Sequence, residues 1–305
     1  MKVLLTGATG FIGSQLVHRL VAEGHQVAIV VRPESQLDVL DAVLPLVQVH
    51  LYDGSYSSLV RALELSESEL VFHVASLFLA QHKPEDVARL IDSNLNFPTQ
   101  LLEAMSHAGV RQLINTGTSW QHYQDETYNP VNLYAATKQG FEALLAYYIE
   151  AQGFRAITLK LFDTYGPGDT RPKLFGLLRK TARTGDTLRM SPGEQLLDLV
   201  YIDDVLDAYL LAMARIPELE KTASYAVSNP ARLSLRELVR VYSATVGRHV
   251  NVAWGGLPYR AREVIQPWTR YEVLPGWQAR TALVDGIVRM EQDKKVCGLL
   301  LEPGP

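Results

Sequence analysis

Three glycines near the N-terminus constrain the fold of this chain more than any other feature. Gly7, Gly10 and Gly13 follow the short apolar segment 3–6 and open the segment 11–23, whose apolar residues recur at helical spacing. In such a strand–turn–helix unit the first glycine makes a tight turn, the second lets the backbone approach a pyrophosphate, and the third packs the helix on the strand. The helix N-terminus then faces the phosphates. The alternative is a tight turn that binds no ligand.

The first two thirds of the chain alternate between short apolar segments and longer helical ones. The expected strands are residues 3–6, 26–31, 46–50, 70–74, 112–116 and 157–162, and the expected helices are residues 11–23, 84–107 and 132–151. This alternation is typical of βαβ units and predicts an α/β fold, a doubly wound parallel sheet of the Rossmann type. After residue 162 the pattern becomes irregular, which predicts a small second lobe that is discontinuous in sequence.

The composition excludes several classes of protein. The 305 residues include 29 Lys and Arg and 33 Asp and Glu, a formal net charge of −4, so the chain is not built mainly to coat nucleic acid or anionic lipid. The single cysteine, Cys297, cannot form an intramolecular disulfide or a cysteine zinc cluster, which is consistent with a reducing cytosol. No apolar run reaches the roughly 18 residues of a membrane span, and the N-terminus has no signal-peptide pattern. We therefore expect a cytoplasmic protein without metal or membrane contact.

The end of the second expected strand bears on the choice of dinucleotide. A carboxylate at this place would accept hydrogen bonds from both ribose hydroxyls of NAD, but the strand ends with Arg32. A guanidinium donates charge-assisted hydrogen bonds to a 2′-phosphate, so Arg32 favours NADPH over NADH unless it is only a solvated loop residue. Asp53 follows the third expected strand, where it could accept a hydrogen bond from the adenine amino group or be merely solvated.

Tyr134 and Lys138 lie four residues apart at the start of an expected helix, which places both side chains on one face. A nearby cation stabilises a phenolate, so we expect Lys138 to lower the pKa of Tyr134 below its usual value of about 10 and to make it an acid–base group. Taken alone, such a pair usually lies on the surface. Thr118 and Ser119 follow a strand that ends at the same sheet edge, and either hydroxyl could bind a substrate carbonyl or serve only the turn.

Together these motifs resemble the extended short-chain dehydrogenases/reductases, the NAD-dependent epimerase/dehydratase family, and in particular its members that act on nucleotide-activated sugars. The resemblance covers nearly the whole chain. It also includes residues 71–75, Asn94, and residues 159–168, 198–204 and 274–277. It implies that Tyr134 is the acid–base, that Lys138 binds the ribose and activates the tyrosine, and that Thr118 binds the carbonyl.

The resemblance also implies which residues bind the two ligands. The residues expected at the dinucleotide are Gly7, Thr9, Gly10, Phe11, Ile12, Gly13, Arg32, Asp53, Ala75 and Lys138. The residues expected at the substrate are Ser119, Asp163, Arg260 and Arg262. Arg260 and Arg262 stand where the family holds the substrate diphosphate, and a solvated basic pair is the alternative.

Departures from the family's patterns narrow the choice of reaction. Ser119 and Trp120 stand where 4,6-dehydratases have an Asp-Glu pair, so the acid and base for eliminating water are missing. Epimerases that act at carbons 3 and 5 use a cysteine near the pocket, whereas Cys297 lies at the far C-terminus. Asp163 replaces a usual asparagine and Leu197 a usual arginine, which weakens contacts with a diphosphate and leaves the sugar and the base open.

The leading hypothesis is an NADPH-dependent reductase that acts on the 4-keto group of a nucleotide-diphosphate-linked 4-keto-6-deoxyhexose in deoxysugar biosynthesis. Residues 115–123 and 133–138 are most similar to sugar 4-ketoreductases of the CDP-abequose synthase type. One alternative is an NAD-dependent nucleotide-sugar 4-epimerase, which uses the same three residues. The other is a non-catalytic dinucleotide-binding regulator, although the tyrosine and lysine that such a protein would lack are both present.

The expected organisation is a homodimer of two-lobed subunits. We expect residues 1–165, with residues 198–230 returning to them, to form the dinucleotide-binding domain. Residues 166–197 and 231–305 are expected to form the nucleotide-sugar-binding lobe. The two long expected helices, 84–107 and 132–151, are apolar on more than one face, as in relatives that dimerise through them. The alternative is that one subunit buries both helices by itself.

Overall fold

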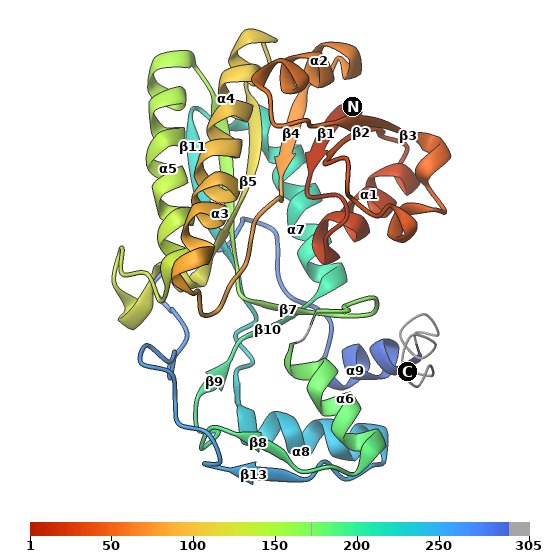
Figure 1. The fold of residues 1–305 in the computed structure, drawn as a ribbon, viewed down its shortest axis with the longest axis vertical. Coiled ribbons are helices and arrows are strands. Elements are labelled where there is room, and N and C mark those ends of the chain that lie inside the picture. The colour runs from red at the N-terminus through yellow and green to blue at the C-terminus, as the bar shows by residue number, and fades with distance from the viewer. Residues whose placement is uncertain (172, 293–305) are drawn as a thin grey trace.

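The computed structural model describes residues 1–171 and 173–292, and its main feature is one parallel sheet (Figure 1). Seven strands form this sheet in the order β11-β6-β5-β4-β1-β2-β3. They are β1 (Lys2–Thr6), β2 (Gln26–Val31), β3 (Val47–Leu51), β4 (Leu70–His73), β5 (Gln112–Thr118), β6 (Arg155–Leu161) and β11 (Thr222–Val227). Every neighbouring pair is parallel. Because the strand order reverses between β1 and β4, the predicted doubly wound sheet of the Rossmann type is confirmed.

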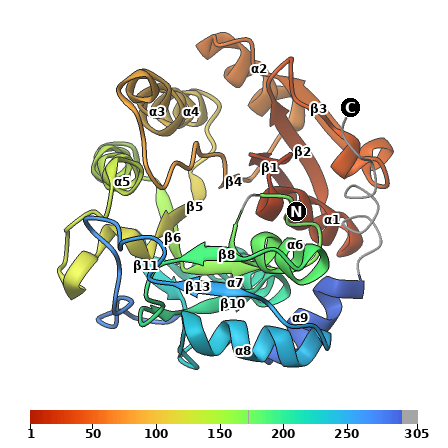
Figure 2. The same cartoon turned by 60° about the horizontal axis from the view of Figure 1, so that its bottom comes forward.

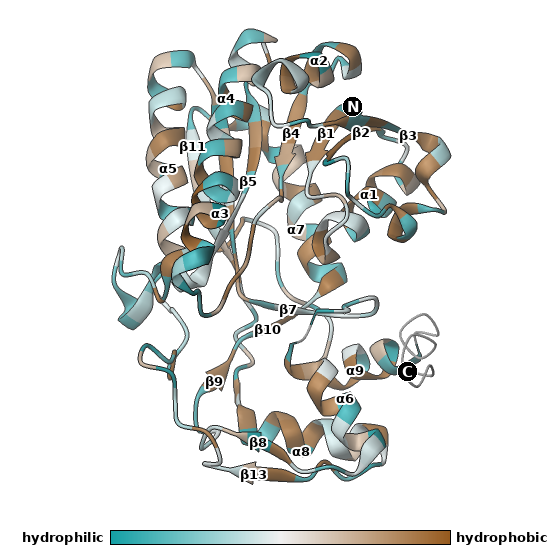
Figure 3. Cartoon of the chain, viewed as in Figure 1, coloured by the Kyte–Doolittle hydropathy of each residue, from teal (hydrophilic) through white to brown (hydrophobic). Residues whose placement is uncertain are grey.

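Helices cover both faces of the sheet because successive residues of each strand point to opposite sides. The flanking helices are α1 (Phe11–Ala22), α2 (Tyr56–Ser66), α4 (Phe97–His107), α5 (Leu133–Gln152) and α7 (Ile202–Arg215). In β1, Val3 and Leu5 join a core with α1 and α7, whereas Leu4 joins a second core with α2, α4 and α5. Figure 3 shows the apolar strands between these helices. Burial on both faces explains why the strands form continuous apolar segments in the sequence.

The segment predicted as one helix over residues 84–107 is helical throughout, in four consecutive pieces of different helix type. They are a 3₁₀ turn (Pro84–Asp86), α3 (Val87–Ile91), a π-helical turn (Asp92–Asn96) and α4. Pro98 has no N–H to donate to the carbonyl of Asn94, so the α-helical hydrogen bonds cannot continue through this point. The buried Asn94 side chain binds the backbone of Leu77 and the hydroxyl of Thr137. It thereby ties the loop after β4 to α5.

A second group of short elements lies beyond the carboxyl ends of the strands, below the sheet in Figure 1, and Figure 2 brings it forward. Its members are β7 (Asp163–Tyr165), α6 (Leu174–Thr184), β8 (Leu188–Met190), β9 (Leu196–Leu197), β10 (Leu199–Tyr201), β12 (Leu233–Ser234), α8 (Leu235–Val246), β13 (Val252–Trp254) and α9 (Leu283–Gln292). β8 pairs with β13 and β9 with β12, so distant parts of the chain lie side by side here. The domain bounds remain a prediction, and Cys297 lies outside the described residues.

Candidate active site

The loop between β1 and α1 lets a ligand approach the backbone closely. Gly7 has a φ of +79°, and a Cβ there would lie 2.6 Å from the Ala75 nitrogen. A Cβ on Gly13 would lie 2.0 Å from the Gly7 carbonyl oxygen, so neither position accepts a side chain. No side chain caps α1 at Gly10, which leaves the first N–H groups of the helix available to an anion. These features fit the pyrophosphate of a dinucleotide.

A cavity of about 830 Å³ joins this loop to the carboxyl ends of the neighbouring strands. Its volume lies in the range of roughly 300–1,000 Å³ that is typical of ligand sites. The predicted dinucleotide and acid–base residues on its wall are Gly7, Thr9, Gly10, Phe11, Ile12, Gly13, Arg32, Ala75, Thr118, Tyr134 and Lys138. The predicted substrate residues Ser119 and Asp163 lie on it as well. We call this space the cofactor cavity.

The two residues predicted at the adenosine end differ in their placement. Arg32 directly follows β2 and lines the cofactor cavity, where its side chain is 71% exposed and lies 3.1 Å from Glu34. Asp53 does not line this cavity, although both of its neighbours in sequence do. Its carboxylate accepts hydrogen bonds from the hydroxyl (2.5 Å) and the N–H (2.9 Å) of Ser55, which lower the pKa of the carboxyl. Asp53 thus shapes the start of α2, and its contact with adenine stays a prediction.

Thr118, Tyr134 and Lys138 are buried where β5 ends and α5 begins. Asn132 caps α5 by accepting a hydrogen bond from the Ala135 N–H (2.9 Å), so the helix starts just before Tyr134. Thr118 Oγ1 accepts a hydrogen bond from the backbone N–H two residues further on (3.3 Å). Its own hydroxyl proton therefore remains free for donation to a ligand.

Burial decides the protonation state of this acid–base pair. It raises the pKa of Tyr134 to about 12, against the smaller effects of a hydrogen bond with Ser76 and the charge of Arg171. Burial also lowers the pKa of Lys138 to about 8, against the opposing charge of Glu142. The expectation that Lys138 lowers the pKa of the tyrosine is therefore not met, because loss of solvent outweighs the hydrogen bond and the charge of Arg171. Near neutral pH Tyr134 is a neutral phenol, which suits a proton donor.

A second cavity, of about 360 Å³, adjoins the cofactor cavity beyond β7, and we call it the substrate cavity. The residues that line both cavities are Phe78, Ser119, Trp120, Phe162, Asp163, Thr164, Arg171 and Lys173. Arg260 lies on the wall of the substrate cavity, 5.4 Å from the ring centre of Trp120, and donates two hydrogen bonds to Glu263 (2.9 and 2.7 Å). A ligand in the substrate cavity can therefore reach the acid–base residues of the cofactor cavity.

The structure separates the two predicted arginines. Arg262 lines neither cavity: it is exposed, lies over the Tyr123 ring at 4.4 Å, and donates a hydrogen bond to Asn129. Arg260 and Arg262 are two residues apart in an irregular segment, and their side chains point in different directions. The expectation that both arginines face one ligand is therefore not met.

Asp163 lies at the start of β7 on the wall that the two cavities share. Its carboxylate is open to the cavities, which are themselves enclosed by protein; this burial raises its pKa, and the charges of Lys173, Arg260 and Arg171 oppose the rise. Lys173 and Arg171 were not among the predicted site residues. The sequence held a signal for them, because Asp169, Arg171 and Lys173 directly follow the family-like segment 159–168 at alternate positions.

Within residues 1–171 and 173–292, no group of three or more His, Cys, Asp or Glu side chains is arranged to hold a metal ion. In the same part of the chain, no helix has both the length and the apolar character needed to span a membrane.

Comparison with known proteins gives the class of this protein. Residues 3–228 match the NAD dependent epimerase/dehydratase family, so the chain belongs to this family, the extended short-chain dehydrogenases/reductases. It is an NAD(P)-dependent enzyme of the oxidoreductase type. The resemblance predicted from the sequence is thereby confirmed.

The relatives and the similar solved structures are mostly enzymes of nucleotide sugars. CDP-abequose synthase of Yersinia pseudotuberculosis is 28% identical over 89% of this chain and 93% of the relative. UDP-glucose 4-epimerase of Lactobacillus helveticus is 24% identical over 94% of this chain and 95% of the relative. The structure of MoeE5 in complex with UDP-glucose and NAD is 27% identical, has a TM-score of 0.81, and is matched over 97% of this chain and 99% of that one.

Proposed function

We propose that this enzyme uses NADPH to reduce the 4-keto group of a nucleotide-diphosphate-linked 4-keto-6-deoxyhexose. The observation that carries the proposal is the junction of the two cavities. Thr118, Tyr134 and Lys138 line the cofactor cavity together with the glycine loop, and Ser119 and Asp163 continue this wall into the substrate cavity. The similarity to CDP-abequose synthases supports the same reaction class.

The side chains at the junction have complementary roles in such a reduction. The dinucleotide supplies the hydride when it is bound. Thr118 donates its free hydroxyl proton in a hydrogen bond to the keto oxygen, which polarises the carbonyl. Tyr134 transfers its phenolic proton to the same oxygen as negative charge develops there. Lys138 binds the ribose and offsets the charge of the resulting phenolate.

The substrate cavity suits a nucleotide sugar with a diphosphate bridge. Arg260 and Lys173 are the cations that would bind the diphosphate, and Asp163 would accept a hydrogen bond from a sugar hydroxyl near the reacting carbon. Ser119 follows Thr118 in the sequence and lines both cavities. Leu197, which replaces the usual arginine, adds an apolar surface to the same wall. Binding energy from the remote nucleotide would then position the keto carbon against Tyr134.

NADPH is proposed as the cofactor because Arg32 directly follows β2 on the wall of the cofactor cavity, where its N–H donates a hydrogen bond to the hydroxyl of Ser35. Similar solved structures contain NAD, and UDP-glucose 4-epimerases are among the relatives, so an NAD-dependent 4-epimerase is the second candidate. Arg32 favours the reductase, because an exchangeable NADPH suits net reduction, whereas a 4-epimerase oxidises and re-reduces the same carbon on one bound NAD. A non-catalytic regulator has no need of a buried tyrosine and lysine beside the glycine loop.

A homodimer is proposed as well, through the helical segment 84–107 and α5. Leu144 and Tyr147 of α5 and Ile91 of α3 are 39%, 60% and 39% exposed in the single chain, which leaves apolar surface on these helices. A second copy would cover it. Light scattering that gives the mass of a single 34.0 kDa chain at micromolar concentration would contradict the dimer.

The decisive experiment supplies NADPH and 4-keto-6-deoxyhexoses linked to CDP, UDP, GDP or dTDP, one at a time. Loss of NADPH absorbance should be stoichiometric with a new 4-hydroxyl group in the product. Interconversion of unoxidised nucleotide sugars without net change in the cofactor would show the epimerase instead. If none of these sugars leads to consumption of NADPH, the proposed substrate class is rejected.

A further inference from the structure

A lysine and a glutamate form a buried ion pair behind the site, outside both cavities. Lys160 Nζ of β6 lies 3.3 Å from Glu142 Oε2 of α5, and the two side chains are only 6% and 18% exposed. Neither residue lines a cavity, and neither belongs to the acid–base group or to the glycine loop. Burying two charges costs free energy that their attraction offsets only in part. Stability alone therefore does not explain this pair. Its other hydrogen bonds indicate a role in the site.

A chain of hydrogen bonds, which we call one arm of the pair, connects Glu142 to Thr118. Glu142 Oε1 accepts a hydrogen bond from Gln121 Nε2 (2.8 Å), and Gln121 Oε1 accepts one from the Thr118 N–H (3.0 Å). Gln121 is completely buried. A Cβ on Gly117 would lie 3.1 Å from both Gln121 Oε1 and Lys160 Cγ, so the glycine leaves just enough room for this packing. The arm fixes the backbone from which the Thr118 hydroxyl faces the cofactor cavity.

The other arm leads to Trp268. Lys160 Nζ donates a hydrogen bond to His122 Nε2 (2.8 Å), and His122 Nδ1 then donates to the Glu126 carbonyl (3.1 Å). The imidazole stacks on the Trp268 indole with ring centres 3.8 Å apart and planes 13° from parallel. Both rings lie on the wall of the substrate cavity. The arm therefore sets the orientation of one wall that a substrate would touch.

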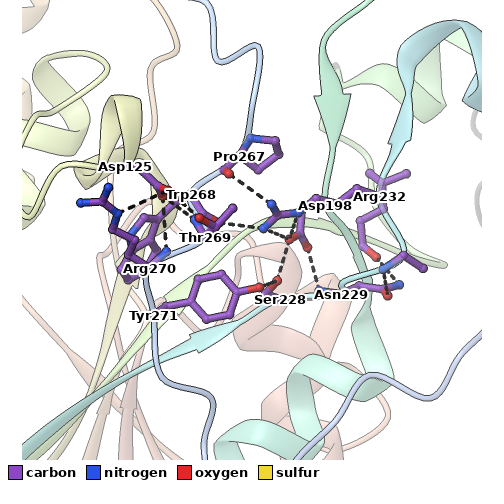
Figure 4. A network of polar contacts seen from close by, with 12 residues as sticks. Asp125, Asp198, Ser228, Asn229, Arg232, Pro267, Trp268, Thr269, Arg270 and Tyr271 are labelled. Carbon is purple, nitrogen blue, oxygen red and sulfur yellow. Dashed lines mark hydrogen bonds and ion pairs between the residues drawn. The ribbon is translucent and has the colours of Figure 1, made fainter.

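The backbone around Trp268 is held independently, as Figure 4 shows. Arg232 donates hydrogen bonds to the carbonyls of Pro267 (3.2 Å) and Trp268 (2.7 Å) and pairs with Asp198. On the other side, Asp125 accepts hydrogen bonds from Thr269. These contacts fix the chain but not the ring. His122 stacks on the indole at the shortest ring distance, and Phe162 and Tyr271 also pack around this ring.

We propose that Glu142 and Lys160 are positioning residues that set both walls of the reaction space at once, Thr118 through Gln121 and Trp268 through His122. The kinetic part of this inference rests on the proposed reduction. Its structural part does not, because the state of His122 can be measured without any substrate.

The charged groups around His122 shift its pKa, and this pKa can be measured. Lys160 approaches it from β6 with Glu142 of α5 behind, and Asp125 belongs to its own loop, paired with Arg270 at 3.8 Å. Burial and the charge of Lys160 lower the pKa of His122 to about 4, while Asp125 acts weakly in the opposite direction. Nε2 is therefore the accepting, unprotonated nitrogen.

The first experiment is an NMR titration of histidine side chains in the full chain. Its test variant is Lys160→Met with Glu142→Gln, which removes both charges together so that no buried charge is left unpaired. His122→Asn assigns the signal. The wild type should show a neutral His122 with the proton on Nδ1 down to about pH 4. In the double variant the pKa of His122 should rise, because the charge of Lys160 no longer opposes protonation, while Nδ1 keeps its proton on the Glu126 carbonyl. An unchanged His122 signal would overturn the proposal.

The second experiment separates the two arms by kinetics. Gln121→Leu should lower kcat about tenfold with little change in KM, because the Thr118 N–H loses its partner while His122 keeps its contact with Lys160. His122→Leu should instead raise the Kd for CDP-glucose or UDP-glucose about tenfold, with the larger effect on KM in turnover of a CDP-linked 4-keto-6-deoxyhexose. If both variants lower kcat and raise KM alike, the pair is only structural and the proposal fails.

A matched control comes from the same helix. Glu150 of α5 pairs with Lys221, which directly precedes β11, but the side chains of Lys221 and Glu150 are 60% and 64% exposed. Lys221→Met should leave kcat, KM and the His122 signal unchanged. If the wild type reduces none of the sugars, the proposed function fails, while the titration of His122 still decides the positioning role.

Discussion

The two cavities of this enzyme are built in different ways. The wall of the cofactor cavity at the β1–α1 loop consists of backbone, where Gly7 and Gly13 have no space for a Cβ. The wall of the substrate cavity consists of side chains from distant segments, several of which already pair with one another. Arg260 binds Glu263 there, and Asp198 binds Arg232. A local shape defines the first wall, whereas a tertiary network defines the second.

This difference separates what is common to the family from what is particular to this chain. Backbone contacts recognise a pyrophosphate whatever the rest of the ligand is, because every peptide unit offers the same N–H. Side-chain contacts recognise one arrangement of hydroxyls and charges. Changes at the first wall should therefore abolish cofactor binding, and changes at the second should alter which substrate binds and how well.

Tyr134→Phe tests the junction between the two walls and should have the largest effect. Removing the phenolic proton should lower kcat by about 10²–10⁴-fold, while the Kd for NADPH stays nearly the same. Single-turnover kinetics and fluorescence titration measure the two quantities. Tyr148→Phe is the matched control, because this tyrosine lies on the same helix and its hydroxyl binds Glu103 away from the site. Near-normal turnover of Tyr134→Phe would show that another group supplies the proton.

Gly13→Ala tests the backbone wall. A Cβ would lie 2.0 Å from the Gly7 carbonyl oxygen, so α1 must move away from the loop. Affinity for the dinucleotide should fall about 100-fold, which corresponds to about 2.7 kcal/mol and lies within the usual cost of overpacking. Gly176→Ala in α6 is the control, since its Cβ would meet only an ordinary contact at 3.6 Å. Equal affinities in calorimetry would show that the loop tolerates a side chain.

The same division explains how much could be predicted from the sequence. The sheet and the glycine loop depend on local patterns, and they were predicted closely. The helix predicted over residues 84–107 is present, but it includes a π-helical turn just before Pro98, which the predicted pattern did not show. The pKa of Tyr134 was predicted in the wrong direction, because burial is a property of the whole fold. Arg262 was placed with Arg260 because the sequence does not show which way side chains point in an irregular segment.

Arg32→Ala tests whether the cofactor cavity also selects by side chain. If the guanidinium makes one or two charge-assisted bonds to a 2′-phosphate, the preference for NADPH over NADH should fall by about 10–100-fold. Titration with both dinucleotides measures it. Glu34→Gln should increase the preference, because Glu34 lies 3.1 Å from this guanidinium and competes for it. A wild type with equal affinities for both cofactors would favour the epimerase.

Arg260→Met tests the side-chain wall, with Arg262→Met as its control. Loss of the Arg260 guanidinium should raise KM for the nucleotide sugar about tenfold and leave the Kd for NADPH unchanged. Arg262 has the same charge and lies two residues away, but it faces Tyr123 and Asn129 outside the cavities. Its substitution should change neither constant. Equal effects of the two variants would mean that net charge, rather than position on the wall, determines substrate affinity.

The smallest expected effect concerns pH and the lysine of the junction. Burial lowers the pKa of Lys138 to about 8, so kcat/KM should fall to about half at this pH and continue to fall above it as the ammonium is lost.

Stability should change in the opposite direction. The unfolded state keeps the proton on this lysine up to its usual pKa near 10.5 and so binds more protons than the folded state between about pH 8 and 10.5. The contribution of Lys138 to the free energy of unfolding should therefore rise with pH across this window. Urea unfolding of the wild type and of Lys138→Met, compared at each pH, isolates that contribution, and pH–rate profiles give the activity. A profile that stays flat to pH 10 would mean that Lys138 keeps an ordinary pKa and that the junction is wetter than the side-chain burial indicates.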